Sequence, residues 1–326
     1  MKKVVSLLIL LTSLMFASQS MASPVLSIFW CGFGGNYCGQ SGSNLNDDDV
    51  NPRATHVILA FVNSNPDGSV SYDDAHQPST DLLAKWRNAG KKVIISVGGQ
   101  NGDWNTIFQH PDTFVNSITQ LVAQHDFDGV DLDIEAYAAA PQTVIDTIKK
   151  LRAALGPNKQ IIVSPESVTV YPTLAVPAPT QGGSPWNYFV PILKAAIDDI
   201  DYVQPQFYNN PYFGFTAGSA EFAEGSYLAW MNKLTEMGGQ YDNPIYTLDD
   251  FAGVPPNKLI LGAIASTEAG NAAYYLTGAH LQTAISTLKS AHNVDVGGVM
   301  LWDSHWDKTN KYEMSNAAAD ALGIPK

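Results

Sequence analysis

The sequence has little positive charge. Lysine and arginine together number 18 among 326 residues, against 31 aspartates and glutamates, so the formal net charge is −13. No cluster of basic residues interrupts this acidity, which argues against a nucleic-acid backbone as a partner. A neutral substrate fits this charge better.

Cysteine is scarce as well. The two that occur, Cys31 and Cys38, bracket the stretch GFGGNY and have no histidine beside them, so they make a poor zinc site. In an exported protein they would form one small-loop disulfide, and two free thiols are the alternative. We expect neither a metal nor a cofactor.

The chain also lacks a long apolar run after its first residues. Val4–Phe16 is apolar but too short to span a bilayer comfortably; two lysines precede it, and the small-x-small pattern Ser20-Met21-Ala22 follows it. This order predicts a secretory signal over residues 1–22, with a retained membrane anchor as the alternative. We expect residues 23–326 to form a soluble, exported monomer, extracellular or periplasmic, with no membrane attachment.

Linker-like low-complexity segments are missing too, so we expect one domain over residues 23–326. Eight apolar runs are predicted to be strands: Val25–Trp30, His56–Val62, Lys92–Val97, Phe127–Glu135, Gln160–Pro165, Asp201–Gln206, Lys258–Ile264 and Val296–Trp302. Most are continuous rather than alternating, which is typical of strands covered on both faces. Candidate helices follow them: Asp81–Ala89, Pro111–Gln124, Pro141–Leu155, Trp186–Asp199, Ala220–Met237, Leu281–His292 and Lys311–Ala321. Only the first crossover, around 44–52, has a weak helical pattern.

Eight strand–helix units over about 300 residues predict an α/β fold, a single (β/α)8 TIM barrel. A doubly wound open sheet is the alternative. Against it, no Gly-x-Gly-x-x-Gly follows the first strand, and the nearest stretch, CGFGGN, has a different spacing. Pro205, in the sixth run, removes a ladder donor, so we expect the regular part of that strand to end early.

One predicted strand carries unusual charge. The stretch DFDGVDLDIE, residues 126–135, holds five carboxylates. Because side chains alternate along a strand, its three aliphatic residues share one face, and Asp131, Asp133 and Glu135 share the other. In a barrel the acidic trio would point toward the interior axis, at steps of about 6–7 Å along the strand.

Three carboxylates stacked in a low-dielectric interior cannot all be ionised cheaply, so we expect them to share a proton and to titrate as a coupled set. Glu135 lies at the C-terminal end, where barrel enzymes carry out their chemistry, and should hold its proton to a higher pH, as a general acid must. One alternative is a helix with a solvated acidic face, but the acidic and aliphatic residues alternate with a period of two, which is typical of a strand. Another is a Mg²⁺ or Ca²⁺ site, but ligands along one strand spread linearly and do not surround an ion.

The segment Asp128–Glu135 resembles the Asp-Gly-x-Asp-x-Asp-x-Glu signature of glycoside hydrolase family 18, the chitinases and their relatives. Further matches occur in chain order. Ser96-Val97-Gly98-Gly99 is similar to the family's Ser-x-Gly-Gly at the end of the third strand. Gln206-Phe207-Tyr208-Asn209 resembles the Gln-x-Tyr-Asn after the sixth, and Trp302 stands where the family closes the eighth strand with a tryptophan. The resemblance covers essentially all of residues 23–326.

The resemblance implies retaining, substrate-assisted hydrolysis of β-1,4-N-acetylglucosamine linkages in chitin or chito-oligosaccharides. Glu135 would protonate the glycosidic oxygen, while the carbonyl oxygen of the substrate's own N-acetyl group attacks the sugar. Asp133 would orient that amide, and Asp131 would share a proton with Asp133. Tyr208 would hydrogen-bond the acetyl oxygen, and Trp302 would form the floor under the reacting sugar.

The resemblance also suggests substrate-binding positions: Trp302, Gln206, Asn209, Ser96, Gly98 and Gly99, with Asn101 and Glu166 as weaker candidates. Non-proline cis peptides would occur at Ala60-Phe61 and Trp302-Asp303. The segment Ser266–His280 is too short for the α+β insertion that walls a deep cleft in some relatives, which favours an open groove and cleavage within chains. Aromatic residues that follow strands are candidates to line it: Phe33, Tyr37, Trp104, Tyr212, Phe213, Tyr275 and Trp306.

Alternatives remain at the level of residues and of function. Tyr208 and Trp302 are also compatible with ordinary core packing. An endo-β-N-acetylglucosaminidase acting on the chitobiose core of N-glycans would use the same chemistry in a different groove. A non-catalytic chitin-binding lectin is disfavoured, because inactive relatives usually lose the acid or its helper, and Glu135, Asp133 and Asp131 are all present here.

Overall fold

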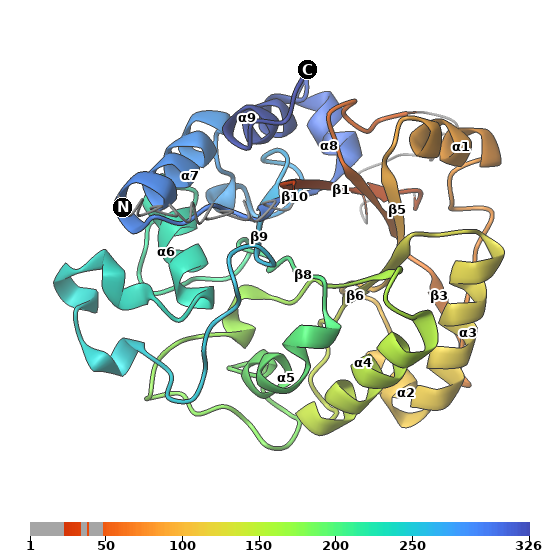
Figure 1. Cartoon of the computed structure of the whole chain (residues 1–326), viewed down its shortest axis with the longest axis horizontal. Helices are drawn as coiled ribbons and strands as arrows, with labels where there is room; N and C mark the ends of the chain where they lie inside the picture. The colour runs from red at the N-terminus through yellow and green to blue at the C-terminus, as the bar shows by residue number, and fades with distance from the viewer. Residues whose placement is uncertain (1–22, 34–37, 39–47) are drawn as a thin grey trace, which may run out of the picture.

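The centre of the molecule is a ring of parallel strands (Figure 1). The computed structural model describes residues 23–33, 38 and 48–326, so the predicted signal lies outside the described residues. The eight strands are β1 (Val25–Cys31), β2 (His56–Ala60), β5 (Lys92–Gly98), β6 (Gly129–Asp133), β7 (Gln160–Val163), β8 (Tyr202–Val203), β9 (Ile260–Ile264) and β10 (Gly298–Trp302). All eight predicted strands are found, most of them shorter than their apolar runs.

The hydrogen-bonded order of these strands is β8-β7-β6-β5-β2-β1-β10-β9. Parallel bridges join Val203 to Leu259 and Gln206 to Gly262, and they close the two ends of this order on each other. Pro205 lies between the two bridges, and β8 ends before it, as its missing N–H predicts. The prediction of a single (β/α)8 barrel is therefore confirmed.

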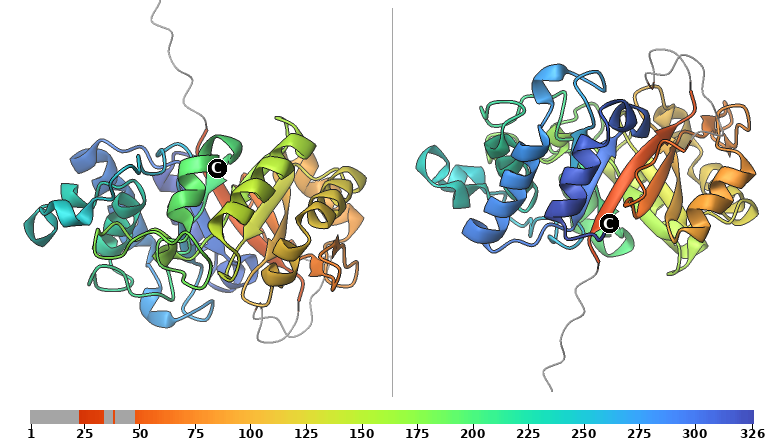
Figure 2. Two further views of the ribbon diagram at one scale, coloured as in Figure 1. Left: turned by 90° about the horizontal axis from the view of Figure 1, so that it is seen from below. Right: turned by 90° about the horizontal axis from the view of Figure 1, so that it is seen from above.

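Helices surround the ring (Figures 1 and 2). They are α1 (Thr80–Asn88), α2 (Trp104–Gln109), α3 (Pro111–Gln124), α4 (Pro141–Leu155), α5 (Phe189–Ala196), α6 (Ala220–Trp230), α7 (Gly278–His292), α8 (Ser304–Thr309) and α9 (Glu313–Ala321). α3 and α4 have the predicted bounds, because Pro111 and Pro141 suit the first helical position, where the backbone N–H has no partner anyway. α5 and α6 end before their predicted limits and are followed by short 3-10 turns.

Several short elements are not predictable from the sequence pattern. They are the hairpin β3 (Asn63–Ser64) and β4 (Val70–Ser71), helices α2 and α8, and the 3-10 turns η1 (Ser167–Thr169), η2 (Ile197–Asp199), η3 (Leu234–Met237), η4 (Gly239–Tyr241), η5 (Pro244–Tyr246) and η6 (Ala272–Tyr274). Each is too short for a hydrophobic period to show. Residues 48–52, the described part of the first crossover, contain no helix, in keeping with the weakness of the helical pattern there.

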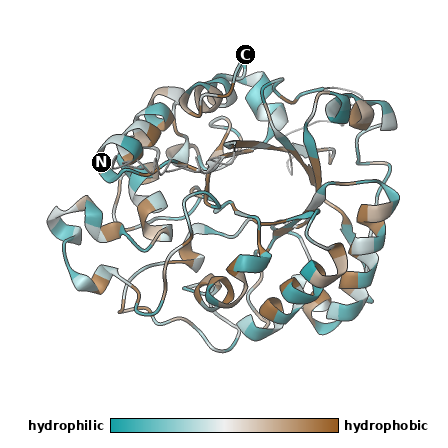
Figure 3. Cartoon of the chain, viewed as in Figure 1, coloured by the Kyte–Doolittle hydropathy of each residue, from teal (hydrophilic) through white to brown (hydrophobic). Residues whose placement is uncertain are grey.

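The strands are hydrophobic along most of their length, and the helices are hydrophilic on their outer faces (Figure 3). Val130, Leu132 and Ile134 are at most 1% exposed. The barrel interior, however, also contains polar residues: Ser27, Ser96, Asp131 and Gln204 have no exposed surface at all. Buried polar groups of this kind need hydrogen-bond partners, and these partners define the site described below.

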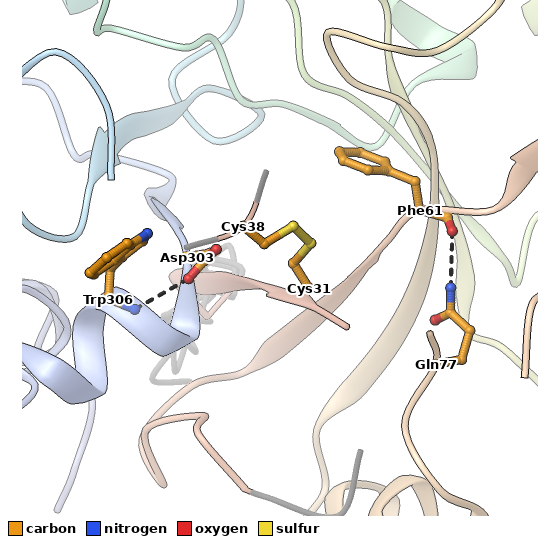
Figure 4. The surroundings of a disulfide bond; sticks show 6 residues. All are labelled: Cys31, Cys38, Phe61, Gln77, Asp303 and Trp306. Carbon is orange, nitrogen blue, oxygen red and sulfur yellow. Dashed lines mark hydrogen bonds between the residues drawn. A yellow bond between two sulfur atoms is a disulfide. The ribbon is translucent and has the colours of Figure 1, made fainter. Parts of the chain in front are cut away.

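The C-terminal ends of β1, β2 and β10 lie side by side around the disulfide (Figure 4). Cys31 and Cys38 are disulfide-bonded, with Cα atoms 5.9 Å apart. Both expected non-proline cis peptides are present, at Ala60-Phe61 and Trp302-Asp303. The amide of Gln77 donates to the carbonyl oxygen of Phe61 at 3.0 Å. Within the described residues, no helix has the length and apolar character needed to cross a membrane.

Candidate active site

A cavity of about 540 Å³ opens at the C-terminal ends of the strands. Its lining comes from the last residues of β6 and β10 and from segments that follow β2, β5, β6, β7, β8 and β9. The lining residues are Phe61, Gly99, Gln100, Asp133, Glu135, Glu166, Gln206, Tyr208, Asn209, Asn210, Ala269, Gly270 and Trp302. Residues far apart in the chain meet here because every parallel strand points its C-terminal end at the same face of the barrel. The structure thus brings together most of the side chains that the sequence pattern singles out.

Asp131 lies below the cavity in a closed hydrogen-bond network. Its Oδ2 accepts from Ser96 Oγ at 2.6 Å, and its Oδ1 accepts from Ser164 Oγ. Gln204 Nε2 donates to Ser164 Oγ at 2.9 Å, and Gln204 Oε1 accepts from Ser27 Oγ at 2.8 Å. These partners come from β1, β5 and the segments after β7 and β8, so Asp131 does point into the barrel, as its position in β6 predicts.

Gln206 forms hydrogen bonds with both Asp133 and Glu135, the two carboxyl groups nearest the cavity. Its single Nε2 donates to Asp133 Oδ1 at 2.9 Å and to Glu135 Oε1 at 2.9 Å. Asp133 is 4% exposed and Gln206 is 9% exposed, whereas Glu135 is only partly buried at the rim. Trp104 Nε1 donates to the backbone oxygen of Asp133 at 2.7 Å, which fixes the strand end behind the two acids.

Burial raises the pKa of all three acids. Burial raises the pKa of Asp131 to about 7, although the serine hydrogen bonds oppose the change. It raises the pKa of Asp133 well above the ordinary aspartate value, and the neighbouring charges of Glu135 and Asp131 add to this. The pKa of Glu135 is also raised, by burial and by the charge of Glu166, against the hydrogen bond from Gln206. Protons are therefore retained in the trio at a pH where ordinary carboxyls are ionised.

Glu166 forms a second anionic position on the cavity wall. Its Oε2 accepts from the Tyr137 hydroxyl at 2.5 Å, and its Oε1 accepts from Asn210 Nδ2 at 3.1 Å. Glu166 follows β7, and its backbone pairs with that of Gln206 through a parallel bridge. Its charge faces Glu135 across the cavity, so this weaker candidate from the sequence belongs to the electrostatics of the site.

Aromatic side chains form another part of the lining. Trp302, at the end of β10, stacks beside Phe61, with ring centroids 6.0 Å apart and ring planes 22° apart. Its ring centroid lies 5.3 Å from that of Phe29. Trp302 remains partly exposed toward the cavity. The pKa of the Tyr208 phenol is raised by burial and then by the charges of Asp133 and Glu135, so this hydroxyl keeps its proton and can donate a hydrogen bond.

Two of the suggested substrate-binding positions lie deeper than expected. Ser96 is fully buried and donates to Asp131, so it supports the carboxyl from below and has no exposed surface for a substrate. Gly98, at φ 116°, is needed for close packing, since a Cβ there would lie 2.1 Å from the backbone oxygen of Asp133. Gly99 does line the cavity, and a Cβ at that position would lie 2.7 Å from the Phe61 ring.

Some of the other residues suggested to bind substrate line a cavity, and others are buried. Asn209 lines the cavity, and its Oδ1 accepts from the Asn271 backbone N–H at 2.9 Å. Asn101 and Phe33 line a neighbouring cavity of about 460 Å³ that shares Phe61 with the first. Of the aromatic residues suggested for the groove, Trp104 and Tyr212 are buried. Tyr37 lies outside the described residues.

Several contributors are not predicted from the sequence: Ser27, Ser164, Phe61, Tyr137 and Asn210. Ser27 and Ser164 do carry a signal, because each is a lone polar residue within or beside an apolar strand. The hydrogen bond between Tyr137 and Glu166 spans 29 positions in the chain. That pairing depends on the relative placement of two loops, for which a single sequence holds no local pattern.

A closed barrel with a protonatable glutamate at its C-terminal rim, a carboxyl directly behind it and an aromatic wall is the arrangement of a barrel glycoside hydrolase. The chain belongs to family 18 of the glycosyl hydrolases, whose family model matches residues 35–313.

Relatives in this family have modest identity to the chain. It is 28% identical over 276 residues to Chitinase ChiA of Flavobacterium johnsoniae, covering 72% of this chain and 17% of that protein. It is 25% identical over 279 residues to Chitinase D of Niallia circulans, covering 72% and 49%. The chain thus spans about half, or less, of the length of these two relatives.

Solved structures share the fold. A family GH18 chitinase from Chromobacterium violaceum superposes with a TM-score of 0.74 at 26% identity, covering 93% of this chain and 84% of that one. A fungal endo-beta-N-acetylglucosaminidase of family 18 has a TM-score of 0.61 at 20% identity, covering 92% and 98%. At that lower identity the likeness concerns the fold alone.

Proposed function

We propose that the protein is a chitinase that hydrolyses β-1,4 linkages between N-acetylglucosamine residues. The observation that carries this proposal is the shared cavity in which Glu135, Asp133, Tyr208 and Trp302 meet. Membership of family 18 and similarity to chitinases from several bacteria and fungi support the substrate class. The net charge of −13 suits an uncharged polymer.

Glu135 is the proposed general acid. It lies at the cavity rim, and its raised pKa keeps a proton available for the glycosidic oxygen. As the bond between the anomeric carbon and that oxygen breaks, the carbonyl oxygen of the substrate's acetamido group attacks the anomeric carbon and closes an oxazolinium ring. Glu135 then takes a proton from water, which opens the ring and restores the original anomeric configuration.

Asp133 is the proposed partner of the acetamido group. It lies one step behind Glu135 on the same strand face, where a carboxyl can accept the amide N–H and stabilise positive charge on the ring. Asp131 is a positioning residue, since it is sealed beneath by Ser96 and Ser164 and acts on substrate only through Asp133. Tyr208 would donate to the acetyl oxygen and fix its approach to the anomeric carbon.

The groove geometry favours cleavage within chains. Between β9 and α7 the described residues contain only the 3-10 turn η6, so no inserted α+β module stands beside the cavity. A polymer can therefore lie across the opening with sugars on both sides. We propose an endo-acting, exported enzyme on this basis, in keeping with the apolar N-terminal stretch of the sequence.

The chemistry is tested by comparing fully acetylated with fully deacetylated glucosamine oligomers of equal length. We expect the acetylated tetramer to be cut to shorter products with retained configuration, observed by NMR of the fresh reducing ends. The deacetylated tetramer should resist cleavage because it lacks the attacking carbonyl. Rapid cleavage of the deacetylated oligomer, or inverted products, would contradict substrate assistance.

The substrate is tested separately with a high-mannose glycoprotein. An endo-β-N-acetylglucosaminidase would release its glycan between the two core sugars, whereas a chitinase should act on the acetylated tetramer alone. Release of the glycan with inactivity on the tetramer would replace the proposed substrate. Binding of the tetramer without any cleavage would instead support a lectin.

A further inference from the structure

Glu166 is a carboxyl on the cavity wall whose hydrogen-bond donors are both uncharged. The Tyr137 hydroxyl donates to its Oε2 at 2.5 Å, and Asn210 Nδ2 donates to its Oε1 at 3.1 Å. Among the described residues, no lysine, arginine or histidine forms an ion pair with it. The side chain is half-buried and lines the cavity. A charge that is partly removed from water and has no counter-ion is costly, so a cationic group in the cavity would be favoured.

The cavity itself supplies no such cation. The acidic residues of its lining are Asp133, Glu135 and Glu166, and none of the described lining residues is basic. Burial raises the pKa of Asp133 and of Glu135, which favours their uncharged forms. The proposed reaction uses these two carboxyl groups and leaves Glu166 without a contact to substrate.

The loops around the cavity do not supply a cation either. Six connections lead from the C-terminal end of a barrel strand to the next helix: 61–79, 99–103, 134–140, 164–188, 204–219 and 265–277. None contains a lysine or an arginine, and their one histidine, His76, contacts Asp73 at 2.7 Å. The connection after β1 has one basic residue, Arg53, which pairs with Asp320 at 2.7 Å. A cleft surrounded by one sign of charge concentrates ligands of the opposite sign.

Glu166 lies on the side of the cavity where the leaving sugar is expected. Trp302 and Phe61, the aromatic wall, come from β10 and from the segment after β2, whereas Glu166 and Asn210 follow β7 and β8 across the ring of strands. A sugar held on Trp302 for reaction therefore places its neighbour in the chain toward Glu166. The charge of Glu166 also acts on Glu135, the proposed donor to the leaving oxygen.

We propose that Glu166 binds the ammonium group of a glucosamine residue on the leaving side of the scissile bond, so that the preferred polymer is partly deacetylated chitin. This inference rests on the proposed function and names the substrate class more closely. The sugar that reacts keeps its acetyl group, because its carbonyl oxygen is the nucleophile. The sugar beside it carries a free amine, which is protonated at mildly acidic pH. The net charge of −13 excludes an anionic polymer and is compatible with a chain that carries scattered ammonium groups.

The test compares two tetramers of equal length at mildly acidic pH and low salt. One is fully acetylated, and the other has acetylated sugars at its two non-reducing positions and glucosamine at its two reducing positions. The readout is the ratio of kcat/KM for the central bond, mixed tetramer over acetylated tetramer. We expect Glu166→Gln to lower this ratio at least about threefold, since it removes a hydrogen bond between charged groups. Any effect of the substitution on Glu135 acts on both substrates and cancels in the ratio.

Asp250→Asn is the matched control. It also removes one negative charge, from an exposed position after η5, and its backbone φ of 57° suits asparagine. The turns η3 to η5 project from the side of the barrel beside α6, away from the ring of strands (Figure 1). The ratio should therefore stay unchanged in this variant. An equal fall in both variants would show that the overall charge sets the preference, and would overturn the assignment to Glu166.

Salt provides a second measurement that does not depend on the folding of a variant. For the unmodified protein, raising the salt concentration from about 0.01 M to about 1 M should lower the ratio, because ions screen the attraction between the ammonium group and Glu166. A ratio that salt does not lower, or that folded Glu166→Gln does not lower, would overturn the inference and leave the proposed function intact. Inactivity of the unmodified protein on both tetramers would instead overturn the proposed function.

Discussion

Glu135 is the residue on which the proposed chemistry depends, and its surroundings favour the protonated form of its carboxyl group. Burial disfavours the carboxylate, and the charge of Glu166 disfavours it further. Gln206 opposes both by donating one N–H to Glu135 and Asp133 together. We therefore expect the three acids to titrate as a coupled group, so that a titration reports the set rather than any single member.

Replacing Glu166 by Gln should move the alkaline limb of the pH–activity profile to lower pH. The groups facing Glu135 are Asp133 on its own segment, Glu166 after β7 and Tyr208 after β8, and the substitution removes one negative charge from this set. With less repulsion the Glu135 carboxylate is easier to form, so the acid loses its proton sooner as pH rises. The pH dependence of kcat/KM on the acetylated tetramer measures this.

Tyr137→Phe is the control for that experiment. It removes the hydrogen bond at Glu166 Oε2 but leaves the charge in place, so the alkaline limb should stay where it is. An identical shift in both variants would show that packing of the loop, rather than the charge of Glu166, sets the limb.

At the scale of elements, β6 and its neighbours set the depth of each side chain. Ser96 pairs with Asp131 and Gly98 with Asp133 across β5 and β6. This register places the serine beneath the cavity and the second glycine, Gly99, at its wall. A strand alternates with a period of two, so the sequence predicts the face of each residue, whereas its height along the barrel depends on register.

The sequence predicted the eight strands, the barrel and the acidic trio because each has a local pattern. The long helices α3 and α4 were predicted to the residue, since a proline begins each of them. The short helices and the β3–β4 hairpin have no such pattern. Partners such as Ser164 and Tyr137 are recognised only when strands and loops distant in the chain are placed side by side.

Closure of the barrel depends on a close approach between the segment after β8 and β9. Gly262 pairs with Gln206, and a Cβ at Gly262 would lie 2.1 Å from the carbonyl oxygen of Pro205. We expect Gly262→Ala to lower the free energy of unfolding by about 1–3 kcal/mol, the usual cost of overpacking, measured by denaturant unfolding. Gly90→Asn is the control: its backbone has φ 77°, which asparagine tolerates, and its surroundings are open. Equal stability of the two variants would contradict the packing argument.

At the scale of the whole molecule, buried acids make stability depend on pH. Burial raises the pKa of Asp303 to about 8, of Asp131 to about 7 and of Asp307 to about 6. In the unfolded chain an aspartate titrates near pH 4, so the folded state binds more protons between these values. The contribution of these three buried carboxyl groups to the free energy of unfolding is fully present below about pH 4. It is lost as the pH rises through the folded-state pKa of each group.

We expect the free energy of unfolding to fall by about 2–4 kcal/mol between mildly acidic and mildly alkaline pH. Asp303→Asn should flatten this dependence, because asparagine carries no charge and can still cap α8 as Asp303 does through the Trp306 N–H. Asp126→Asn, at an exposed turn, should leave the slope unchanged. Chemical denaturation across the pH range measures both, and a slope that Asp303→Asn does not alter would contradict the assignment.

The most direct test of the account is the turnover of Glu135→Gln on the acetylated tetramer, with binding measured on the same protein. Glutamine preserves the shape of the side chain but has no acidic proton to give, so kcat should fall by at least about 10²–10⁴-fold. The tetramer should still bind, because the rest of the cavity is unchanged. Turnover within a few fold of the unmodified protein would show that another group protonates the leaving oxygen and that the site has been assigned wrongly.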